Sequence, residues 1–116
     1  MKYEAETRPW GMYQVLLDTE FTKVKLITVA PKSRLSLQSH KKRQEQWTVV
    51  KGTLTVVLND LEWTLPATGE SIKIPQGAKH RAWNKTDKLV QFIEVQTGQY
   101  FGEDDIIRYE DDYERV

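Results

Sequence analysis

Four side chains in this sequence have the types and spacing of a transition-metal site: Gln38, His40, Glu45 and His80. His40 and His80 are the only two histidines in the chain. Gln38 and His40 are two residues apart, so on a β-strand their side chains point to the same face. Imidazole suits zinc, iron, nickel or copper, and two imidazoles with one carboxylate leave coordination positions open for a substrate. This pattern predicts a site that binds a divalent ion and can catalyse.

Short segments that alternate apolar and polar residues fill most of the chain and predict β-strands. They span residues 12–17, 23–29, 34–39, 46–50, 53–58, 61–65, 71–74, 80–84 and 89–97. Turn-forming residues separate them, such as the Lys-Gly pair at 51–52 and the Asn-Asp pair at 59–60. We therefore expect an all-β jelly-roll barrel, whose interior can hold a ligand near one mouth. The acidic tail at 102–113 predicts a short helix or turn on the barrel exterior.

The alternation also predicts which side chains share the barrel interior. It places Glu45, Trp47 and Val49 on one face of a strand and position 46 on the other. His80 follows a Pro-Gly turn and reaches the same space from another strand. The four candidate ligands come from segments far apart in the sequence, so a closed β-fold is needed to make them neighbours.

Composition limits the function classes. With 116 residues the chain fits one domain, which we expect to span 1–116. It has 17 Lys and Arg against 17 Asp and Glu, so no basic field points to nucleic acid or to an anionic membrane as partner. There are no cysteines, which excludes disulfides and thiolate sites. The sequence contains no long apolar run or signal peptide, so we expect a soluble, cytoplasmic protein.

Two motifs resemble those of the cupin family. The first combines a ligand pair, a glutamate and a turn glycine, here Gln38, His40, Glu45 and Gly52, with Gln38 in place of the first histidine. The second ends on a ligating histidine, here with Gly69, Pro75, Gly77 and His80. The resemblance implies a cupin double-stranded β-helix for the whole chain.

Within the cupins, the chain is similar to the cupin domain of type II mannose-6-phosphate isomerase from Arg8 to about Arg115. The strings Arg-Pro-Trp-Gly at 8–11 and Gly-Glu-Asp-Asp-Ile at 102–106 are part of this resemblance. Such a domain commonly forms the C-terminal half of a bifunctional enzyme with a mannose-1-phosphate guanylyltransferase. The 116 residues include no such half, so nucleotidyl transfer is not expected. The sequence departs from the pattern at Gln46, where a histidine is common, and at Lys32, where a turn glycine is usual.

The resemblance implies an enzyme that interconverts mannose 6-phosphate and fructose 6-phosphate around one divalent ion. Zinc is the first expectation, and cobalt, nickel, manganese and iron also suit the ligands Gln38, His40, Glu45 and His80. The candidate base is Glu94, Lys25 or a metal-bound water, which the sequence does not rank. Fixed cations are needed for the phosphate. We expect Arg43 and Arg81 to line the mouth, with Arg43 close to the chemistry, and Arg8 and Arg108 as further substrate-binding residues.

Two other function classes stay open at this point. A non-enzymatic sugar-phosphate-binding module could work with a separate guanylyltransferase, and the departure at Gln46 favours it. An iron-dependent oxygenase could use two histidines and a glutamate, although Gln38 as a fourth ligand and the arginines argue against it. A homodimer is expected by resemblance to other cupins, with exposed aromatic residues near the N-terminal strand as the contact.

Overall fold

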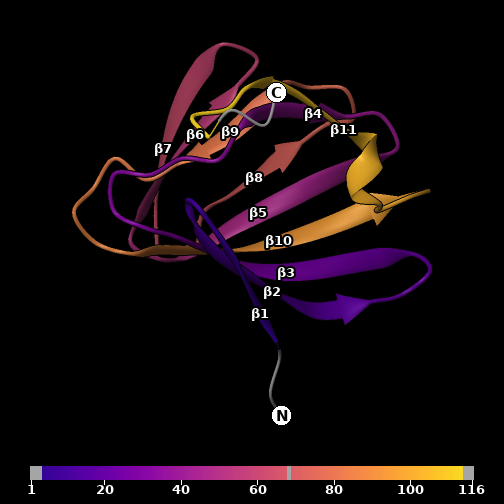
Figure 1. Cartoon of the computed structure of the whole chain (residues 1–116), viewed down its shortest axis with the longest axis horizontal. Helices are drawn as coiled ribbons and strands as arrows, with labels where there is room; N and C mark the ends of the chain where they lie inside the picture. The colour runs from indigo at the N-terminus through magenta and orange to yellow at the C-terminus, as the bar shows by residue number, and fades with distance from the viewer. Residues whose placement is uncertain (1–3, 68, 114–116) are drawn as a thin grey trace.

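The computed structural model describes residues 4–67 and 69–113, so both ends of the expected domain, including Arg115, lie outside the described residues. The described chain folds into two antiparallel sheets that face each other, with one sheet along the upper part of the molecule and the other below it (Figure 1). Of the described residues, none belongs to a helix that is long and apolar enough to cross a lipid bilayer. The expected all-β class is confirmed.

The lower sheet has six strands and carries half of the predicted site residues. Across the sheet they are β1 (Ala5–Arg8), β2 (Gly11–Asp18), β3 (Thr22–Val29), β10 (Val90–Gly98), β5 (Arg43–Lys51) and β8 (Ser71–Ile74). β10 lies between β3 and β5, so Glu94 is opposite Lys25 on one side and Trp47 on the other. The same register puts Gln96 opposite Glu45.

The upper sheet has five strands and carries the remaining candidate ligands. Across the sheet they are β11 (Ile106–Glu110), β4 (Leu37–His40), β9 (His80–Trp83), β6 (Thr53–Leu58) and β7 (Leu61–Pro66). Gln38 on β4 is the cross-strand partner of His80 on β9 and of Arg108 on β11. Residues distant in the sequence therefore lie in one row across this sheet.

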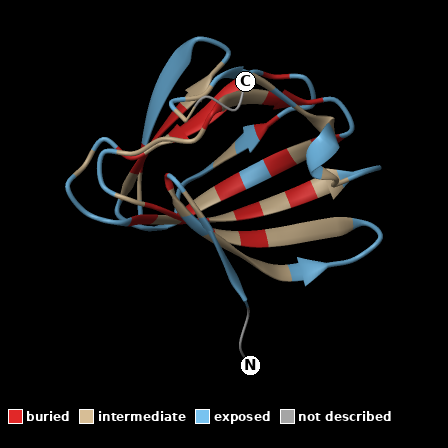
Figure 2. Cartoon of the chain, viewed as in Figure 1, coloured by how far each residue is buried: buried red, intermediate tan, exposed pale blue. Residues whose placement is uncertain are grey.

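An apolar core fills the space between the two sheets. Its buried members are Trp10, Ile27, Val29, Trp47, Val49, Leu54, Val56, Leu65, Ile74, Ala82, Val90 and Phe92. Along β5, buried Glu45, Trp47 and Val49 alternate with the exposed residues Gln46 and Val50, as expected from the sequence (Figure 2). Burying these apolar side chains is the main favourable contribution to folding.

Both ends of the described chain form strands that sequence patterning did not predict. β1 has the sequence Ala-Glu-Thr-Arg, is mostly exposed and lies at the edge of its sheet, so it shows no apolar alternation. The acidic tail contains the expected turn, a single 3-10 turn at Glu103–Asp105, but the next residues form β11 instead of continuing outside the barrel. Pairing with β4 explains this difference, because it satisfies the backbone of the tail.

One departure from the cupin pattern has a simple backbone explanation. Lys32 has a φ of +58°, in the left-handed region that a glycine adopts without steric cost. The turn before β4 therefore keeps the conformation that explains the usual glycine there. Lys32 is held in this turn by donating from Nζ to the Lys85 carbonyl oxygen at 2.8 Å.

Candidate metal centre and its pocket

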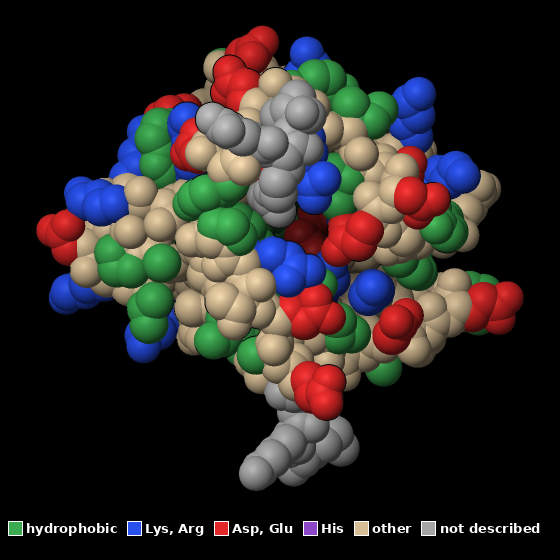
Figure 3. Space-filling view, in the orientation of Figure 1, with side chains coloured by type: hydrophobic (Ala, Val, Ile, Leu, Met, Phe, Trp, Pro, Cys, Tyr) green, Lys and Arg blue, Asp and Glu red, His purple; other side chains and the backbone are tan. Residues whose placement is uncertain are grey.

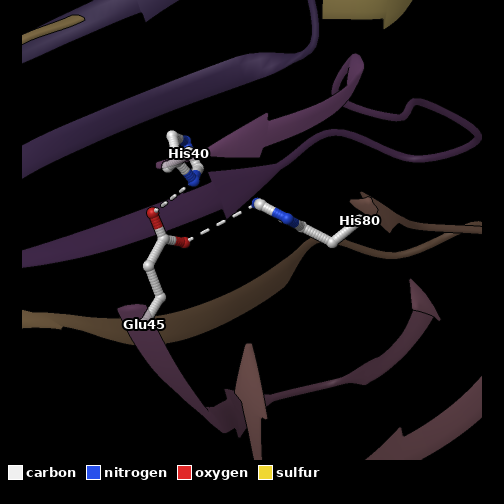
Figure 4. A group of neighbouring side chains, drawn as sticks. All are labelled: His40, Glu45 and His80. Atoms are coloured by element: carbon white, nitrogen blue, oxygen red, sulfur yellow. Dashed lines mark ion pairs between the residues drawn. The ribbon is translucent and has the colours of Figure 1, made fainter. Parts of the chain in front are cut away.

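Three buried side chains from three strands converge between the sheets. One ligand atom each from His40, Glu45 and His80 lies within 4.8 Å of the others, and all three residues are buried. Glu45 Oε2 is 3.5 Å from His40 Nδ1, and Glu45 Oε1 is 4.0 Å from His80 Nε2 (Figure 4). This donor set could hold a divalent metal ion, whose identity the geometry leaves open.

Burial disfavours the charged form of both imidazoles, and the neutral form is the state that a metal ligand requires. Burial, followed by the charge of Arg43, lowers the pKa of His40 to about 3. Burial also lowers the pKa of His80. His80 Nδ1 lies 2.9 Å from the Ala78 carbonyl oxygen, so this nitrogen carries the proton and donates it. The lone pair of His80 Nε2 consequently faces the cluster.

Gln38 is placed to supply a fourth donor. Its Oε1 lies 3.1 Å from His40 Nε2, and its Nε2 donates to Ser36 Oγ at 2.9 Å. In this orientation the amide oxygen, the end that can bind a metal ion, faces the imidazole. Ser36 is almost completely buried, and its role could not be inferred from its type alone. The only signal was its position two residues before Gln38, on the same face of an extended segment.

Arg43 binds the cluster directly. Its Nε donates to Glu45 Oε2 at 2.9 Å, and its Nη2 lies 2.9 Å from His40 Nε2. A guanidinium only donates, so His40 Nε2 is the acceptor in this contact. Trp47 Nε1 donates to the other oxygen, Glu45 Oε1, at 2.9 Å. The Glu45 carboxylate is therefore oriented from both sides by buried donors.

Glu94 lies beside the cluster with a perturbed acidity. Burial, followed by the Glu45 carboxylate, raises the pKa of Glu94 to about 7. Gln96 Nε2 donates to Glu94 Oε2 at 2.8 Å, and the Gln96 side chain is completely buried. A carboxyl group with this pKa can exchange a proton near neutral pH. Gln96 was not predicted as a site residue, although it follows Glu94 by two residues on the same face.

A pocket opens next to the cluster and gathers several predicted site residues. Its charged lining residues are Arg8, Lys25, Arg43, Glu94, Glu103 and Arg108, and Gln38 also lines it. A smaller adjoining pocket is lined by Gln38, Glu45, His80 and Glu94 together with the Arg81 segment. The face in Figure 3 is hollowed near its centre, where basic side chains flank a hollow with an acidic side chain at depth. The larger pocket thus has more cationic than anionic lining groups.

Arg81 has a different environment from the other predicted arginines. Its Nε donates to the Leu35 carbonyl oxygen at 2.9 Å, and its Nη1 donates to Glu110 Oε1 at 3.1 Å. His80 and Arg81 are adjacent on β9, so their side chains point to opposite faces of the strand. These contacts tie Arg81 to the C-terminal strand β11, and its substrate-binding role stays a prediction.

Gln46 points away from the cluster. It is exposed, and its Nε2 lies 3.4 Å from Ser71 Oγ on the neighbouring strand β8. The departure from the cupin pattern at this position therefore lies outside the ligand set. The four candidate ligands together offer two neutral nitrogens, a carboxylate and an amide oxygen, so the residues present fit a divalent ion.

Comparison with known proteins places the chain in a family. Residues 2–111 match the protein family described as Mannose-6-phosphate isomerase C-terminal. The chain belongs to this family. It is 46% identical over 109 residues to the xanthan biosynthesis protein XanB of Xanthomonas campestris pv. campestris, and that match covers 94% of this chain. It is also 46% identical over 109 residues, again 94% of this chain, to the mannose-1-phosphate guanylyltransferase ManC of Salmonella typhimurium.

These family members are much longer proteins. The chain spans 23% of XanB and 22% of ManC. It therefore corresponds to the isomerase-family cupin domain that such proteins contain.

A solved structure supports the fold assignment. The chain superimposes with a TM-score of 0.78 on an uncharacterized conserved protein with a double-stranded β-helix domain from Klebsiella pneumoniae. The match covers 93% of this chain and 86% of that chain at 22% sequence identity. The expected cupin double-stranded β-helix is confirmed.

Proposed function

We propose that this domain is a metal-dependent aldose-ketose isomerase of the cytoplasm that interconverts mannose 6-phosphate and fructose 6-phosphate. The observation that carries the proposal is the adjacency of a cation-lined pocket, a buried His-Glu-His cluster and the Glu94 carboxyl group. Membership in the isomerase family supports the same reaction. A sugar phosphate needs both the cation-lined pocket and the cluster, because its phosphate requires cations and its carbonyl requires an electrophile.

Gln38, His40, Glu45 and His80 would hold the metal ion, for which zinc is the first expectation. When bound, such an ion supplies positive charge that polarises the sugar oxygens and stabilises an enediolate. Glu45 is committed to this role by its position between the two histidines. The base is therefore a group other than Glu45.

Glu94 is the base in this proposal. Its carboxylate removes the proton from C2 of the open-chain aldose, and the electron pair of the broken C–H bond forms the enediolate. The same carboxyl group returns the proton to C1, while a proton moves from the C2 hydroxyl to the C1 oxygen, which gives the ketose. A pKa of about 7 suits a group that must both accept and donate a proton. Gln96 fixes the orientation of the carboxyl group by its hydrogen bond.

The direct test is a coupled assay for fructose 6-phosphate formed from mannose 6-phosphate. Purified protein is treated with chelator and reloaded with zinc, cobalt, nickel, manganese or iron(II), one at a time. We expect turnover with at least one ion, loss of turnover with chelator and loss in the Glu94→Gln variant. Gln91→Glu is a control that changes charge on the same strand without touching the cluster. Absence of turnover with every ion, in protein shown to bind it, contradicts the proposal.

A second function is favoured by one observation. Arg43 satisfies His40 and Glu45 by direct hydrogen bonds, so the cluster is held together by protein groups alone. This suits a sugar-phosphate-binding module that acts with a separate guanylyltransferase. Binding of mannose 6-phosphate without turnover, and with the same affinity after chelation, would favour the module. Oxygen uptake by the iron-loaded protein would instead indicate an oxygenase.

Sedimentation velocity tests the expected homodimer.

A further inference from the structure

The cations of the larger pocket differ in how well they are paired. Arg43 binds Glu45 and His40, whereas Arg8 donates to Glu6 at 2.9 Å and to the Tyr13 hydroxyl at 3.1 Å. Arg108 has no ion pair or side-chain hydrogen bond within the part of the chain that the structure describes, and its Nε is buried. Arg108 is half-buried, and leaving its Nε–H without an acceptor is costly, so an anion at this nitrogen would satisfy it.

Lys25 is the second incompletely paired cation. Its side chain is only 8% exposed, and its single ion pair with a described residue joins Nζ to Glu103 Oε1 at 3.5 Å. The ammonium also lies 4.4 Å from the centre of the Tyr13 ring. Glu103 is 55% exposed, and Lys25 is its only ion-pair partner among the described residues. An ion pair of this length with a half-exposed carboxylate is weak and can be displaced.

These two cations come from opposite sheets and line one pocket with Glu103. We infer that Arg108 and Lys25 form the subsite for the phosphate group of the substrate, and that the Glu103 carboxylate occupies this subsite until a phosphate displaces it. The inference deepens the proposed function and rests on it for the identity of the sugar. Guanidinium and ammonium groups are the usual phosphate partners, and a dianion satisfies both better than one carboxylate.

The register of the sheets places this subsite at a defined position beside the cluster. Arg108 is the cross-strand partner of Gln38, and Lys25 is the cross-strand partner of Glu94. Each cation is therefore one strand, about 5 Å, away from a residue of the proposed reaction centre. The phosphate would lie between β3 and β11, and the sugar chain would extend from there toward Glu94 and Gln38. This arrangement assigns Lys25 to phosphate binding and removes it as the base.

The test measures binding of inorganic phosphate to chelator-treated protein by calorimetry, so that no metal ion competes for the anion. Arg108→Gln should weaken phosphate binding about tenfold or more, because one of two principal cations is lost. Glu103→Gln should strengthen it about threefold or more, because the competing carboxylate is lost. The matched controls are Lys51→Gln and Glu20→Gln, two exposed residues outside the pocket, and they should change affinity by less than twofold.

Several results would overturn the inference. These are equal phosphate affinity in Arg108→Gln and Lys51→Gln, weaker or unchanged binding in Glu103→Gln, or phosphate binding that requires the metal ion. Glu103→Gln alters a half-exposed side chain, so it remains informative if Arg108→Gln does not fold. Phosphate binding that follows the expected pattern in a protein without isomerase turnover would contradict the proposed function and leave the subsite standing. Turnover with an unchanged KM for mannose 6-phosphate in Arg108→Gln would contradict the subsite alone.

Discussion

The central strands have two halves with different chemistry on the same inward face. Toward the pocket, β5, β10 and β3 bury Arg43, Glu45, Glu94, Gln96 and Lys25. Farther along the same strands they bury Trp47, Val49, Phe92, Val90, Ile27 and Val29. Burying a charge costs desolvation free energy, whereas burying an apolar group lowers the free energy of the folded state. The apolar half thus stabilises the fold. The polar half lowers the free energy of unfolding, and the apolar half offsets this cost.

The largest effect is expected from damage to the apolar core, which Leu54 on β6 shares with the apolar half of these strands. Leu54 is completely buried, and Leu54→Ala should lower the free energy of unfolding by about 3 kcal/mol, since it leaves a cavity. Leu61→Ala makes the same chemical change at a side chain that is 61% exposed, and should cost less than about 0.5 kcal/mol. Urea unfolding measures both. Equal losses in the two variants would contradict the stabilising role assigned to buried apolar side chains.

The next effect is a pH dependence from the polar half. The pKa of Glu94 is raised to about 7 in the folded protein, above 4.5 in the unfolded chain. Its contribution to stability is therefore present below pH 4.5 and is lost as the pH rises through about 7, a change on the order of 3 kcal/mol. Relative to Glu94→Gln, the metal-free wild-type protein should lose stability across this range. A stability difference between the two proteins that does not vary with pH would contradict the raised pKa.

The lowered pKa of His40 gives a pH dependence of stability in the opposite direction, both in wild type and in Glu94→Gln. Its contribution is present above about pH 6.5 and is lost as the pH falls toward 3. Comparing wild type with Glu94→Gln at each pH removes the part of this contribution that comes from burial and from Arg43, while the part that depends on the Glu94 charge remains in the difference. Denaturant unfolding in the presence of chelator is the appropriate measurement.

Metal affinity should report on the polar half alone. Glu45→Gln removes the only carboxylate of the proposed ligand set and should weaken zinc or cobalt binding about 100-fold or more. The matched control is Glu70→Gln, which alters an exposed glutamate and should bind the ion as wild type does. Cobalt absorption spectra and calorimetry give the affinities. Wild-type affinity in Glu45→Gln would show that the cluster does not bind the ion.

The smallest effect is expected one contact away from the ligands. Ser36→Ala removes the acceptor that orients the Gln38 amide, so cobalt affinity should fall about tenfold. Ser71→Ala is the matched control, because its hydroxyl accepts from the Gln46 amide outside the barrel. If both variants bind cobalt equally well, Gln38 does not depend on Ser36 for its orientation.

Much of the fold could be predicted because alternation along a strand directly reflects burial. Trp47 and Val49 indicate the inward face of β5, and alternation places Glu45 on the same face. β1 could not be predicted in this way, since it is an exposed edge strand stabilised by pairing with β2 instead of by an apolar face. β11 was hidden for another reason: its acidic neighbours suggested a surface turn, whereas its backbone pairs with β4.

The site was predictable where a residue type limits the chemistry. Two histidines and one nearby glutamate leave few ways to build a ligand set, and the structure brings them together with Gln38. Roles that depend on burial or on partners distant in the sequence could not be read from it. Glu103 contacts Lys25 across 78 positions of sequence, so it had no local signal. Gln96 is on the same face of β10 as Glu94, but its role depends on Glu94 being buried. The contacts of Arg81 with Glu110 were hidden for the same reason.

The indole of Trp47 belongs to both halves of the barrel. Its ring packs 4.8 Å from Phe92 and 5.6 Å from His80, while its Nε1 donates to Glu45. Any repacking beneath this ring would turn the carboxylate that it holds. A substitution that stabilises the core beneath this ring is therefore expected to alter the orientation of the Glu45 carboxylate as well.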